Sequence, residues 1–343
     1  MTAGSGGRER AARPPVLSDV AALAGVSMMT VSRALNDPAR VHPDTRARVL
    51  AAVRKLGYRP NSAARRLVTG RSGALGVVSF DTTLYGPAST LHAIEQAARR
   101  RDYVLNIASL DTLNRLSIED AVDRLRAQSV DGVIVVAPHE SAAEGLNHLP
   151  AELPVVAVDA GDSPSVPVVM VDQYGGAVRA TRHLLSLGHE TVWHITGPDD
   201  WVDARGRAEG WKAALEAAGR QAPEPLAGDW TARSGYRAGR RLAADPAVTA
   251  VFAANDQMAL GLLRALREAG RRVPEDVSVV GFDDIPEAAY LWPPLTTVRQ
   301  DFHEVGAQAV DLLLSRLAGA PAPGARTVEP ELIVRESATP PRS

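Results

Sequence analysis

Short apolar runs alternate with amphipathic segments along residues 73–337. In segments such as 90–101, 118–128 and 180–188, apolar residues recur at helical spacing, and the runs between such segments read as buried strands. Strands that alternate with helices predict parallel sheets with helices on both faces. Because this part is too long for one such sheet, we expect two α/β subdomains. The runs are ALGVVSF, YVLNIAS, GVIVVAP, VPVVMVD, TVWHITG, AVFAAND and VSVVGFDD.

The N-terminal part has shorter, helical patterns. Ser18 can cap a first helix that Gly25 ends, and Ser27 can cap a second helix. Pro43 then opens a third helix that reaches Leu56. Two short helices joined by a glycine turn and followed by a third are typical of the helix–turn–helix module, an all-α DNA-binding domain.

A very short helical segment follows this module. Pro60 stops the third helix, and Asn61 can cap a new helix from Ser62 to about Val68. A helix of this length is unstable alone, so we expect it to fold only on DNA, where Leu67 would insert between base steps of the minor groove. The alternative is an ordinary flexible linker.

Charge is distributed unevenly along the chain. Residues 1–72 contain 13 Lys and Arg against 4 Asp and Glu, a net charge of +9, whereas the remainder has 25 against 36, or −11. A basic module on an acidic body indicates nucleic-acid binding. A solvated arginine-rich arm is the alternative interpretation.

The composition excludes several classes of protein. The chain has no Cys, which rules out disulfides and zinc–thiolate sites. No apolar run approaches the roughly 18 residues of a membrane span. Residues 1–15 lack the apolar core of a secretory signal, and we expect a disordered leader there. These features predict a cytoplasmic protein without membrane association.

The second helix would enter the major groove by its N-terminal end, where Met28 and Met29 lie. Exposed methionines at this position can contact thymine methyl groups, and Arg33 can hold a guanine in a bidentate contact. The alternative is that both methionines pack within the protein. Candidates for phosphate contacts are Ser27, Thr30, Ser32, Asn36, Arg40 and Thr45.

Three segments together carry a resemblance to a known family. Residues 17–67 read LSDVAALAGVSMMTVSRALNDPARVHPDTRARVLAAVRKLGYRPNSAARRL. Further on, the chain reads FAANDQMALGLLRALREAGRRVPEDVSVVGFDD and then PPLTTVRQDF. These segments resemble the lac repressor family of transcriptional regulators, and the resemblance spans roughly residues 16 to 337.

The resemblance implies a sequence-specific regulator that binds double-stranded, palindromic operator DNA as a homodimer. It also implies a body similar to periplasmic binding proteins, with a site for a small saccharide effector. It implies no catalytic residue, no metal and no cofactor. The leucine-rich tail that makes tetramers in this family is missing after LIVRESATPPRS, so we expect a dimer.

The resemblance also assigns DNA contacts. It aligns Met28, Met29 and Arg33 with base-reading positions, and it aligns Leu67, beside Ala64, with a leucine that wedges into the central minor groove. Two methionines depart from a polar pair found in the family, so a different operator is expected. The predicted DNA-binding residues are Ser27, Met28, Met29, Thr30, Arg33, Asn36, Thr45, Asn61, Ala64 and Leu67.

Polar residues that end the apolar runs are candidates for ligand binding, because ligands of such α/β sheets bind beyond the carboxyl ends of the strands. The candidates by position are Asp159, Thr196, Gly197, Asn255, Asp256 and Asp283. The resemblance selects among them and adds others. The predicted effector-binding residues are Leu84, Tyr85, Asp159, Trp201, Asp203, Arg207, Trp230, Asn255, Asp283, Gln300 and Phe302.

Alternatives stand beside these assignments. Trp230 and Phe302 could be core residues, and Asn255 and Asp283 could serve only as caps or turn residues. Trp201 and Asp203 lie at positions where the family has small serines. An extra stacking surface and an extra acceptor there favour a larger glycoside or an oligosaccharide.

These observations divide the chain into domains. We expect a leader over 1–15, a helix–turn–helix domain over 16–60, a hinge helix and linker over 61–72, and an effector-binding and dimerisation domain over 73–343. Within the last, the N-subdomain would cover about 73–172 plus 302–325, and the C-subdomain about 173–300 plus 326–337.

The most favoured function is a repressor of sugar-utilisation genes that a galactoside or other glycoside releases from its operator. The sign of the effect comes from the resemblance alone, so a family regulator with a nucleobase or other metabolite as corepressor is the alternative. A sugar-active enzyme on the same core is more distant. The sequence contains no P-loop, GxGxxG, HExxH or GxSxG motif, and an enzyme would leave the basic module unexplained.

Overall fold

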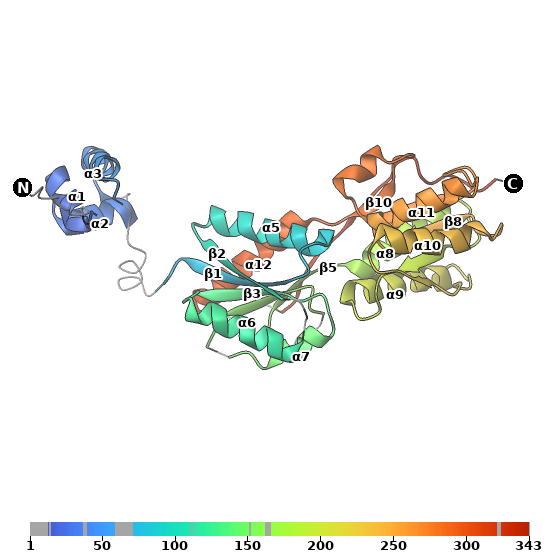
Figure 1. Ribbon diagram of the computed structural model, residues 1–343, viewed down its shortest axis with the longest axis horizontal. Coiled ribbons are helices and arrows are strands. Elements are labelled where there is room, and N and C mark those ends of the chain that lie inside the picture. Colours follow the sequence, from blue (N-terminus) through green and yellow to red (C-terminus); the bar gives the residue numbers. More distant parts are fainter. Residues whose placement is uncertain are drawn as a thin grey trace, which may run out of the picture. The chain divides into compact units, whose positions relative to one another are not determined.

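The computed structural model describes residues 13, 15–36, 40–58, 71–110, 112, 114–150, 152–161, 166–320 and 324–342. The chain forms two compact units, residues 1–72 and 73–343, which we call the N-terminal unit and the C-terminal unit and describe separately (Figure 1). The predicted hinge residues Asn61, Ala64 and Leu67 and almost all of the predicted leader lie outside the described residues.

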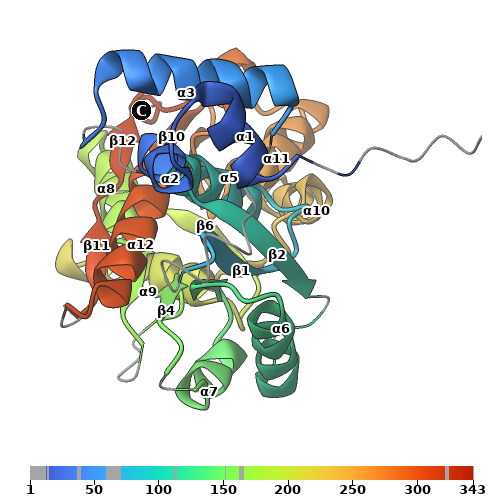
Figure 2. The same ribbon diagram turned by 90° about the vertical axis from the view of Figure 1, so that its left-hand side faces the viewer.

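Three helices build the N-terminal unit. They are α1 (Leu17–Ala24), α2 (Met28–Asn36) and α3 (Pro43–Leu56), and Figure 2 shows α3 lying along the other two. Their apolar faces meet in one small core. Its fully buried members include Val20, Val31 and Val49.

Local signals set most of the ends of these helices, as the sequence predicts. Gly25 ends α1 in the left-handed conformation (φ 64°), and the Thr30 N–H donates to Ser27 Oγ over 3.1 Å at the start of α2. The prediction for Ser18 was wrong. The N-cap is Val16, two residues earlier, because the Asp19 carboxylate accepts the N–H of Val16 over 2.9 Å and so closes the first turn.

The C-terminal unit contains two six-stranded sheets of the same design. The first has the strand order β11-β5-β4-β3-β1-β2, and all of its neighbouring strands run parallel. Its strands are β1 (Ala74–Phe80), β2 (Val104–Leu110), β3 (Gly132–Val136), β4 (Val155–Val158), β5 (Val168–Val171) and β11 (Arg326–Val328).

The second sheet has the order β12-β10-β9-β8-β6-β7. Its strands are β6 (Trp193–Thr196), β7 (Leu226–Ala227), β8 (Ala250–Ala253), β9 (Ser278–Asp283), β10 (Thr296–Arg299) and β12 (Glu331–Ile333). The expectation of parallel strands holds except at one edge, where β12 pairs antiparallel with β10. The chain enters this edge from β11 of the first sheet, which ends only a few residues before β12.

Helices cover both faces of each sheet (Figure 1). On the first sheet, α5 (Tyr85–Arg100) and α12 (Phe302–Leu317) enclose one core, and α6 (Arg115–Ala127) and α7 (Ser141–Asn147) enclose the other. On the second sheet, the pairs are α8 with α9 and α10 with α11. Their bounds are Gln173–Ser186, Val202–Ala217, Ala232–Ala243 and Asp256–Glu268, and a short 3-10 helix covers Pro286–Tyr290.

The chain passes between the sheets after β5, after β10 and after β11. We call the layers around the first sheet the first subdomain and those around the second sheet the second subdomain. The predicted boundary at residue 326 needs correction. Strand β11 pairs with β5, so residues 326–328 belong to the first subdomain, and the final crossing lies between β11 and β12.

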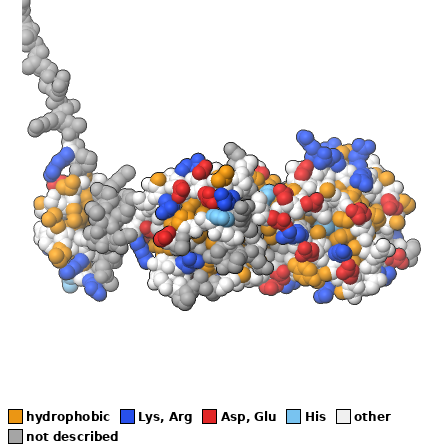
Figure 3. Space-filling view, turned by 90° about the horizontal axis from the view of Figure 1, so that it is seen from below, with side chains coloured by type: hydrophobic (Ala, Val, Ile, Leu, Met, Phe, Trp, Pro, Cys, Tyr) orange, Lys and Arg blue, Asp and Glu red, His pale blue; other side chains and the backbone are white. Residues whose placement is uncertain are grey.

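The outer surface of the C-terminal unit is charged with both signs. On the face seen in Figure 3, acidic and basic side chains are interspersed, with a group of basic side chains at the end formed by the second subdomain. Among the described residues, no helix is both long and apolar enough to span a membrane.

Candidate functional site

A cavity of about 650 Å³, including its open mouth, lies between the two subdomains of the C-terminal unit. Such a volume is in the range of roughly 300–1,000 Å³ that is usual for small-molecule sites. Every residue that the sequence analysis assigned to effector binding lies in its wall. These residues are Leu84, Tyr85, Asp159, Trp201, Asp203, Arg207, Trp230, Asn255, Asp283, Gln300 and Phe302.

Arg207, on α9, is the centre of the polar wall. Its side chain is buried; Nε donates to Gln173 Oε1 over 2.8 Å, and Nη1 donates to the carbonyl of Ala254. The guanidinium also lies 3.5 Å from Asp283 and 3.9 Å from Asp203. This network fixes the orientation of the arginine before any ligand arrives.

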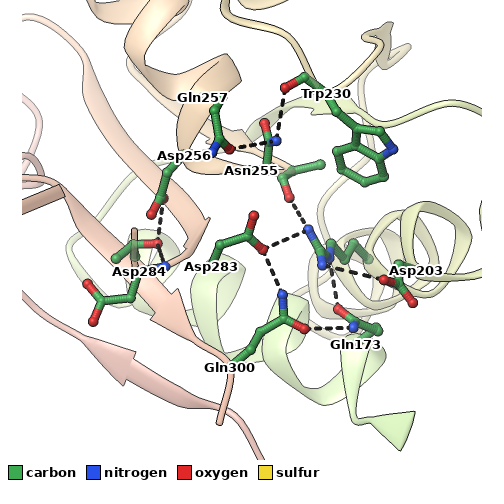
Figure 4. Close-up of polar contacts among 12 residues, drawn as sticks. Gln173, Asp203, Trp230, Asn255, Asp256, Gln257, Asp283, Asp284 and Gln300 are labelled. Atoms are coloured by element: carbon green, nitrogen blue, oxygen red, sulfur yellow. Dashed lines mark hydrogen bonds and ion pairs between the residues drawn. The ribbon is translucent and has the colours of Figure 1, made fainter. Parts of the chain in front are cut away.

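Asp283 and Gln300 extend the network to the ends of β9 and β10. The Gln300 amide donates to Asp283 Oδ1 over 2.7 Å, and its carbonyl oxygen accepts from Gln173 Nε2 over 2.9 Å. Gln173 therefore joins Arg207 to Gln300 across a large separation in sequence. Its contact with Gln300 is drawn in Figure 4. Its amide holds both cavity side chains although Gln173 itself does not line the cavity.

Asn255 has the capping role that the sequence analysis considered. Its side-chain oxygen accepts the N–H of Met258 over 2.9 Å, which caps α11. Its amide donates to the carbonyl of Trp230 and to Gln257 Oε1, so both of its N–H groups are engaged. Asn255 lines the cavity, but its side-chain hydrogen bonds are all made to other residues of the protein around it.

Three aspartates of the cavity have raised pKa values. Burial raises the pKa of Asp283 to about 6, with Arg207 and Gln300 opposing the shift and Asp203 adding to it. Burial also raises the pKa of Asp203, against the nearby Arg207. The pKa of Asp159 lies well above its usual range, first because of burial and then because of Asp203. Each carboxylate is thus held where its charge is costly.

Two indoles form the apolar part of this wall. Trp201 and Trp230 are each 7% exposed and meet edge to face with ring centroids 5.5 Å apart. The sequence analysis left open whether Trp230 is a core residue or a cavity residue. It is both, because it packs among buried residues of α10 and α11 and also lines the cavity. Its Nε1 has no hydrogen-bond partner among the described residues.

The opposite wall comes from the first subdomain. Leu84 precedes α5, Tyr85 begins it, and Phe302 begins α12. The rings of Tyr85 and Phe302 meet edge to face at 5.8 Å. Asp159 follows β4 and is the only charged side chain that the described part of this wall contributes.

Backbone conformation sets three of the cavity residues apart. Asp159, Trp230 and Asp283 have φ angles of 55°, 67° and 108°. Side chains other than glycine adopt this left-handed region rarely, and such residues concentrate at functional sites, where surrounding structure maintains the strain. The position of these residues therefore supports a ligand site at the cavity.

Sequence reasoning missed several contributors. Gln173 and Gln257 have no motif, and Thr83, Gly86, Pro87, Thr90, Val136 and Pro138 complete the lining. Only their neighbourhood in sequence could have marked some of them, because Gln257 follows Asn255 and Pro87 follows Tyr85. No group of His, Asp and Glu in the described residues has the geometry to hold a metal ion.

The N-terminal unit presents its own candidate surface. Met28 and Met29 are 55% and 63% exposed, so neither packs into the small core. Arg33 is also exposed, one turn along α2. Ser27 caps α2 and shares a hydrogen bond with Thr30, and Thr45 is half-buried in the first turn of α3. The side chain of Asn36 lies outside the described residues.

The N-terminal unit is a helix–turn–helix with an exposed helix end, and the C-terminal unit has a cavity between two α/β subdomains. In one chain, these two features define the class of regulators that bind both DNA and a small ligand. The comparisons agree. Residues 16–61 match the model for bacterial regulatory proteins of the lacI family, and residues 181–338 match that for a periplasmic binding protein-like domain.

The chain belongs to the lacI family of transcriptional regulators. It is 34% identical over 336 residues to the lactose operon repressor of Escherichia coli (strain K12), which covers 96% of this chain and 92% of that protein. It is 39% identical to the transcriptional regulator CelR of Thermobifida fusca, over 95% of this chain and 98% of CelR. It is 34% identical to the transcriptional repressor PurR of Haemophilus influenzae (strain PittEE), over 94% and 98%.

Solved structures of two of these relatives have the same architecture. The lac repressor dimer bound to operator and the anti-inducer ONPF superposes with a TM-score of 0.84 at 33% identity, covering 95% of this chain and all of that one. The CelR–cellobiose complex gives 0.70 at 36% identity, covering 94% and 100%. The prediction of a DNA-binding regulator with a periplasmic-binding-protein-like body is confirmed, and the enzyme alternative is excluded.

Proposed function

We propose that this regulator is a repressor that binds a palindromic operator as a homodimer and releases it when a saccharide fills the cavity. The chemistry of the cavity carries the proposal. Two indole faces suit the apolar face of a pyranose, and fixed carboxylate, guanidinium and amide groups suit its hydroxyls. Such a site rejects ligands that leave its polar groups unpaired.

The relatives give further support. Solved structures of CelR with cellobiose and of the lac repressor with ONPF cover nearly the whole chain at more than 30% identity. In this chain, Trp201 and Asp203 both line the cavity, so the substitution that favours a larger glycoside or an oligosaccharide lies where it would touch the ligand. A disaccharide is therefore the effector that we favour.

Coupling between the two ligands follows from the position of the cavity. A sugar that touches both subdomains favours one arrangement of them, and operator DNA favours another. Linkage then requires that each ligand weaken the other by the same factor. A saccharide inducer acts by this route without any contact to DNA.

Fluorescence anisotropy on a labelled palindrome from beside the gene tests the proposal. We expect tight operator binding that a disaccharide in a panel of galactosides, glucosides and xylosides weakens. Operator binding that no saccharide alters would remove the saccharide effector while leaving the DNA-binding function in place. Binding that a sugar tightens would make the protein respond to a corepressor.

A purine corepressor is the second candidate function, because PurR relatives match at 34% identity over 94% of this chain. Planar bases also stack on indoles such as Trp201 and Trp230. Guanine, hypoxanthine and adenine belong in the same panel. If a purine tightened operator binding and no sugar had an effect, a purine corepressor would replace the saccharide inducer in the proposed function.

The DNA surface has a matched test. Arg33→Ala should weaken the operator by about 1–3 kcal/mol and relax base preference at one position, and Met29→Ala should cost less because it loses only apolar contacts. Lys55→Ala removes the same charge from the last turn of α3 and is the control. Equal losses for Arg33→Ala and Lys55→Ala would show that Arg33 reads no base.

A further inference from the structure

The turn that leads into α2 is short. Helix α1 ends at Ala24 and α2 begins at Met28, so only residues 25–27 set the direction in which the chain enters α2. Gly25 takes the left-handed conformation that ends α1, and the N–H of Val26 donates to the carbonyl of Ala21 over 3.1 Å. The last carbonyls of a helix have no partner within the helix itself, so they need partners from elsewhere.

Arg48, on α3, supplies that partner. Its Nη2 donates to the carbonyl of Ala24 over 2.9 Å and to the carbonyl of Gly25 over 3.3 Å, and its Nε donates to Ala24 over 3.3 Å. The planar guanidinium offers several N–H groups in a fixed fork, which lets one side chain hold two successive carbonyls. Its positive charge also lies at the negative end of the α1 dipole, where a cation is favourable.

Arg48 differs in this respect from a neighbouring arginine of the same helix. Among the described residues, all side-chain hydrogen bonds of Arg48 go to the turn. Arg54 is exposed like Arg48, but its side chain makes no hydrogen bond or ion pair with a described residue. The two arginines thus share a helix and a charge, and they differ in their contact with the turn.

The other connections of α2 do not replace this contact. Ser27 Oγ accepts the N–H of Thr30 and shares a hydrogen bond with the Thr30 hydroxyl over 2.9 Å, which orders the start of α2 but does not join it to α3. The small core that includes Val31 and Val49 packs the helices together through apolar contacts, which have no directional preference. Arg48 adds a directional link from α3 to the turn.

Such a link affects base contacts more than phosphate contacts. A bidentate contact of Arg33 with a guanine requires the start of α2 to lie at a defined place in the groove. Attraction to phosphates depends mainly on charge and tolerates displacement. A turn without the link would have to be ordered on binding, and that ordering costs affinity for the correct sequence.

We propose that Arg48 is a positioning residue for operator recognition. Its guanidinium fixes the turn before α2, and the turn places Met28 and Arg33 against the bases. Arg48 itself contacts neither base nor phosphate in this role. The inference rests on the proposed base contacts of α2 and adds a residue of another helix on which they depend.

The ratio of specific to non-specific affinity tests the inference. The operator is the duplex that the wild-type chain selects from a random pool, so no sequence has to be assumed. Fluorescence anisotropy on the full chain would compare this duplex with an unrelated one of equal length at several salt concentrations. For Arg48→Met, we expect the operator affinity to fall by about tenfold, the loss that charge-assisted hydrogen bonds would give. The affinity for the unrelated duplex should change by less than about twofold, because no phosphate contact is lost.

Two further variants are the controls. Arg54→Met removes the same charge from α3 without touching the turn, so it should keep the ratio of the two affinities. Arg48→Lys keeps the charge but has no fork, so the operator affinity should recover to within about threefold of the wild type. It also keeps the test valid if Arg48→Met does not fold. Thermal melts would give a temperature at which every variant compared is folded.

A double substitution separates positioning from a general loss of stability. If Arg48 acts through α2, Arg33→Ala should cost about threefold less operator affinity, or an even smaller loss, in the Arg48→Met background than in the wild type. The reason is that the base contact is already weakened there, so the two effects do not add. In the Arg54→Met background, Arg33→Ala should cost as much as in the wild type.

The outcomes are distinct. Equal losses on both duplexes for Arg48→Met, with a weaker dependence on salt, would make Arg48 a phosphate contact and overturn the inference. An unchanged operator affinity, or additive effects of Arg48→Met and Arg33→Ala, would also overturn it. If Arg33→Ala cost nothing in the wild type, the proposed base contact would fail, whereas the ratio of affinities in Arg48→Met would still decide the role of Arg48.

Discussion

The two walls of the cavity come from subdomains of the same design but have opposite chemistry. The strand orders of the two sheets correspond position by position, and each sheet has helices on both faces. The first subdomain nevertheless contributes mainly apolar groups such as Leu84, Tyr85 and Phe302, whereas the second contributes the charged network around Arg207. Shared architecture therefore does not determine the chemistry of a wall.

The contrast suggests a division of labour. The polar wall is ordered by hydrogen bonds within the second subdomain, from Gln173 through Arg207 and Gln300 to Asp283, so it is ready to select a ligand. In the described part of the apolar wall such bonds are few, so this wall can close over a ligand without breaking them. Selection by one wall and closure by the other would couple ligand binding to the arrangement of the subdomains.

The largest expected effect comes from removing the centre of the polar wall. Arg207→Ala leaves Asp203 and Asp283 without the one cation that pairs with them among the described residues, so the free energy of unfolding of the C-terminal unit should fall by about 3–5 kcal/mol. Chemical denaturation measures it. Lys212→Ala, on the same helix in an exposed pair with Glu216, should cost no more than about 0.5 kcal/mol. Equal costs would mean that the polar wall is not an ordered network.

The second effect concerns pH. Because burial raises the pKa of Asp283 to about 6, the folded state binds a proton that the unfolded state, with its ordinary acidity, releases. Stability should therefore fall as the pH rises through the window between the two pKa values, by about 1 kcal/mol from pH 5 to pH 7. Asp203 and Asp159, whose pKa values are also raised, act in the same direction.

Denaturation of the wild type and of Asp283→Asn at several pH values checks this effect. The variant cannot titrate at this position, so its stability should depend less steeply on pH in that window. If both proteins gained stability in parallel as the pH rose from 5 to 7, burial in the polar wall would not be raising the pKa of Asp283.

A substitution in the apolar wall should have a smaller effect, which is on the affinity for the effector, and this effect should not depend on pH. Phe302→Ala removes a half-buried ring that meets Tyr85, so the affinity for the effector should fall by about fivefold, equivalent to about 1 kcal/mol of lost apolar contact. Tyr290→Ala, which removes a ring that is 88% exposed, is the control. Titrations at pH 6 and pH 8 should give the same ratio. A ratio that changes with pH would assign Phe302 to the charged network.

The two walls also differ in how far sequence predicts them. The run 74–80 is strand β1 to the residue, because a continuous apolar stretch marks a buried strand. Strand β10 has no such signal, since it begins with Thr296 and Thr297, yet both are fully buried. The hydroxyl of Thr297 donates to Asp256 over 2.6 Å, and this bond, invisible in the sequence, is what permits the burial.

For the cavity, the family resemblance placed every predicted side chain in one site, which periodicity alone would not have done. The connections between these side chains were not predictable. Gln173 follows the crossing of the chain after β5, whereas Gln300 precedes the crossing after β10, and no local pattern encodes that these two points meet beside Arg207. Likewise, Asn255 could be read as a cap from its position before α11, but its bond to the carbonyl of Trp230 depends on the tertiary fold.

The smallest effect is expected where the two walls touch at the edge of the cavity. His139, after β3, forms a bridge with Trp201, and its Nδ1 lies 3.2 Å from the carboxylate of Asp200. Burial lowers the pKa of His139, with Asp200 opposing the shift, so the ring is mainly neutral at pH 7 and the pair gains little charge attraction. Asp200 is also 69% exposed, which screens the interaction further.

Asp200→Asn should therefore change the free energy of unfolding at pH 7 by less than about 0.5 kcal/mol, with little dependence on salt. The aromatic contacts of Trp201 with His139 and Phe80, at 4.7 and 6.4 Å, remain in that variant and should continue to join the walls. A loss above about 1 kcal/mol that shrinks in high salt would show that charge, rather than ring packing, links the subdomains. The division between a charged wall and an apolar wall would then fail at the point where they meet.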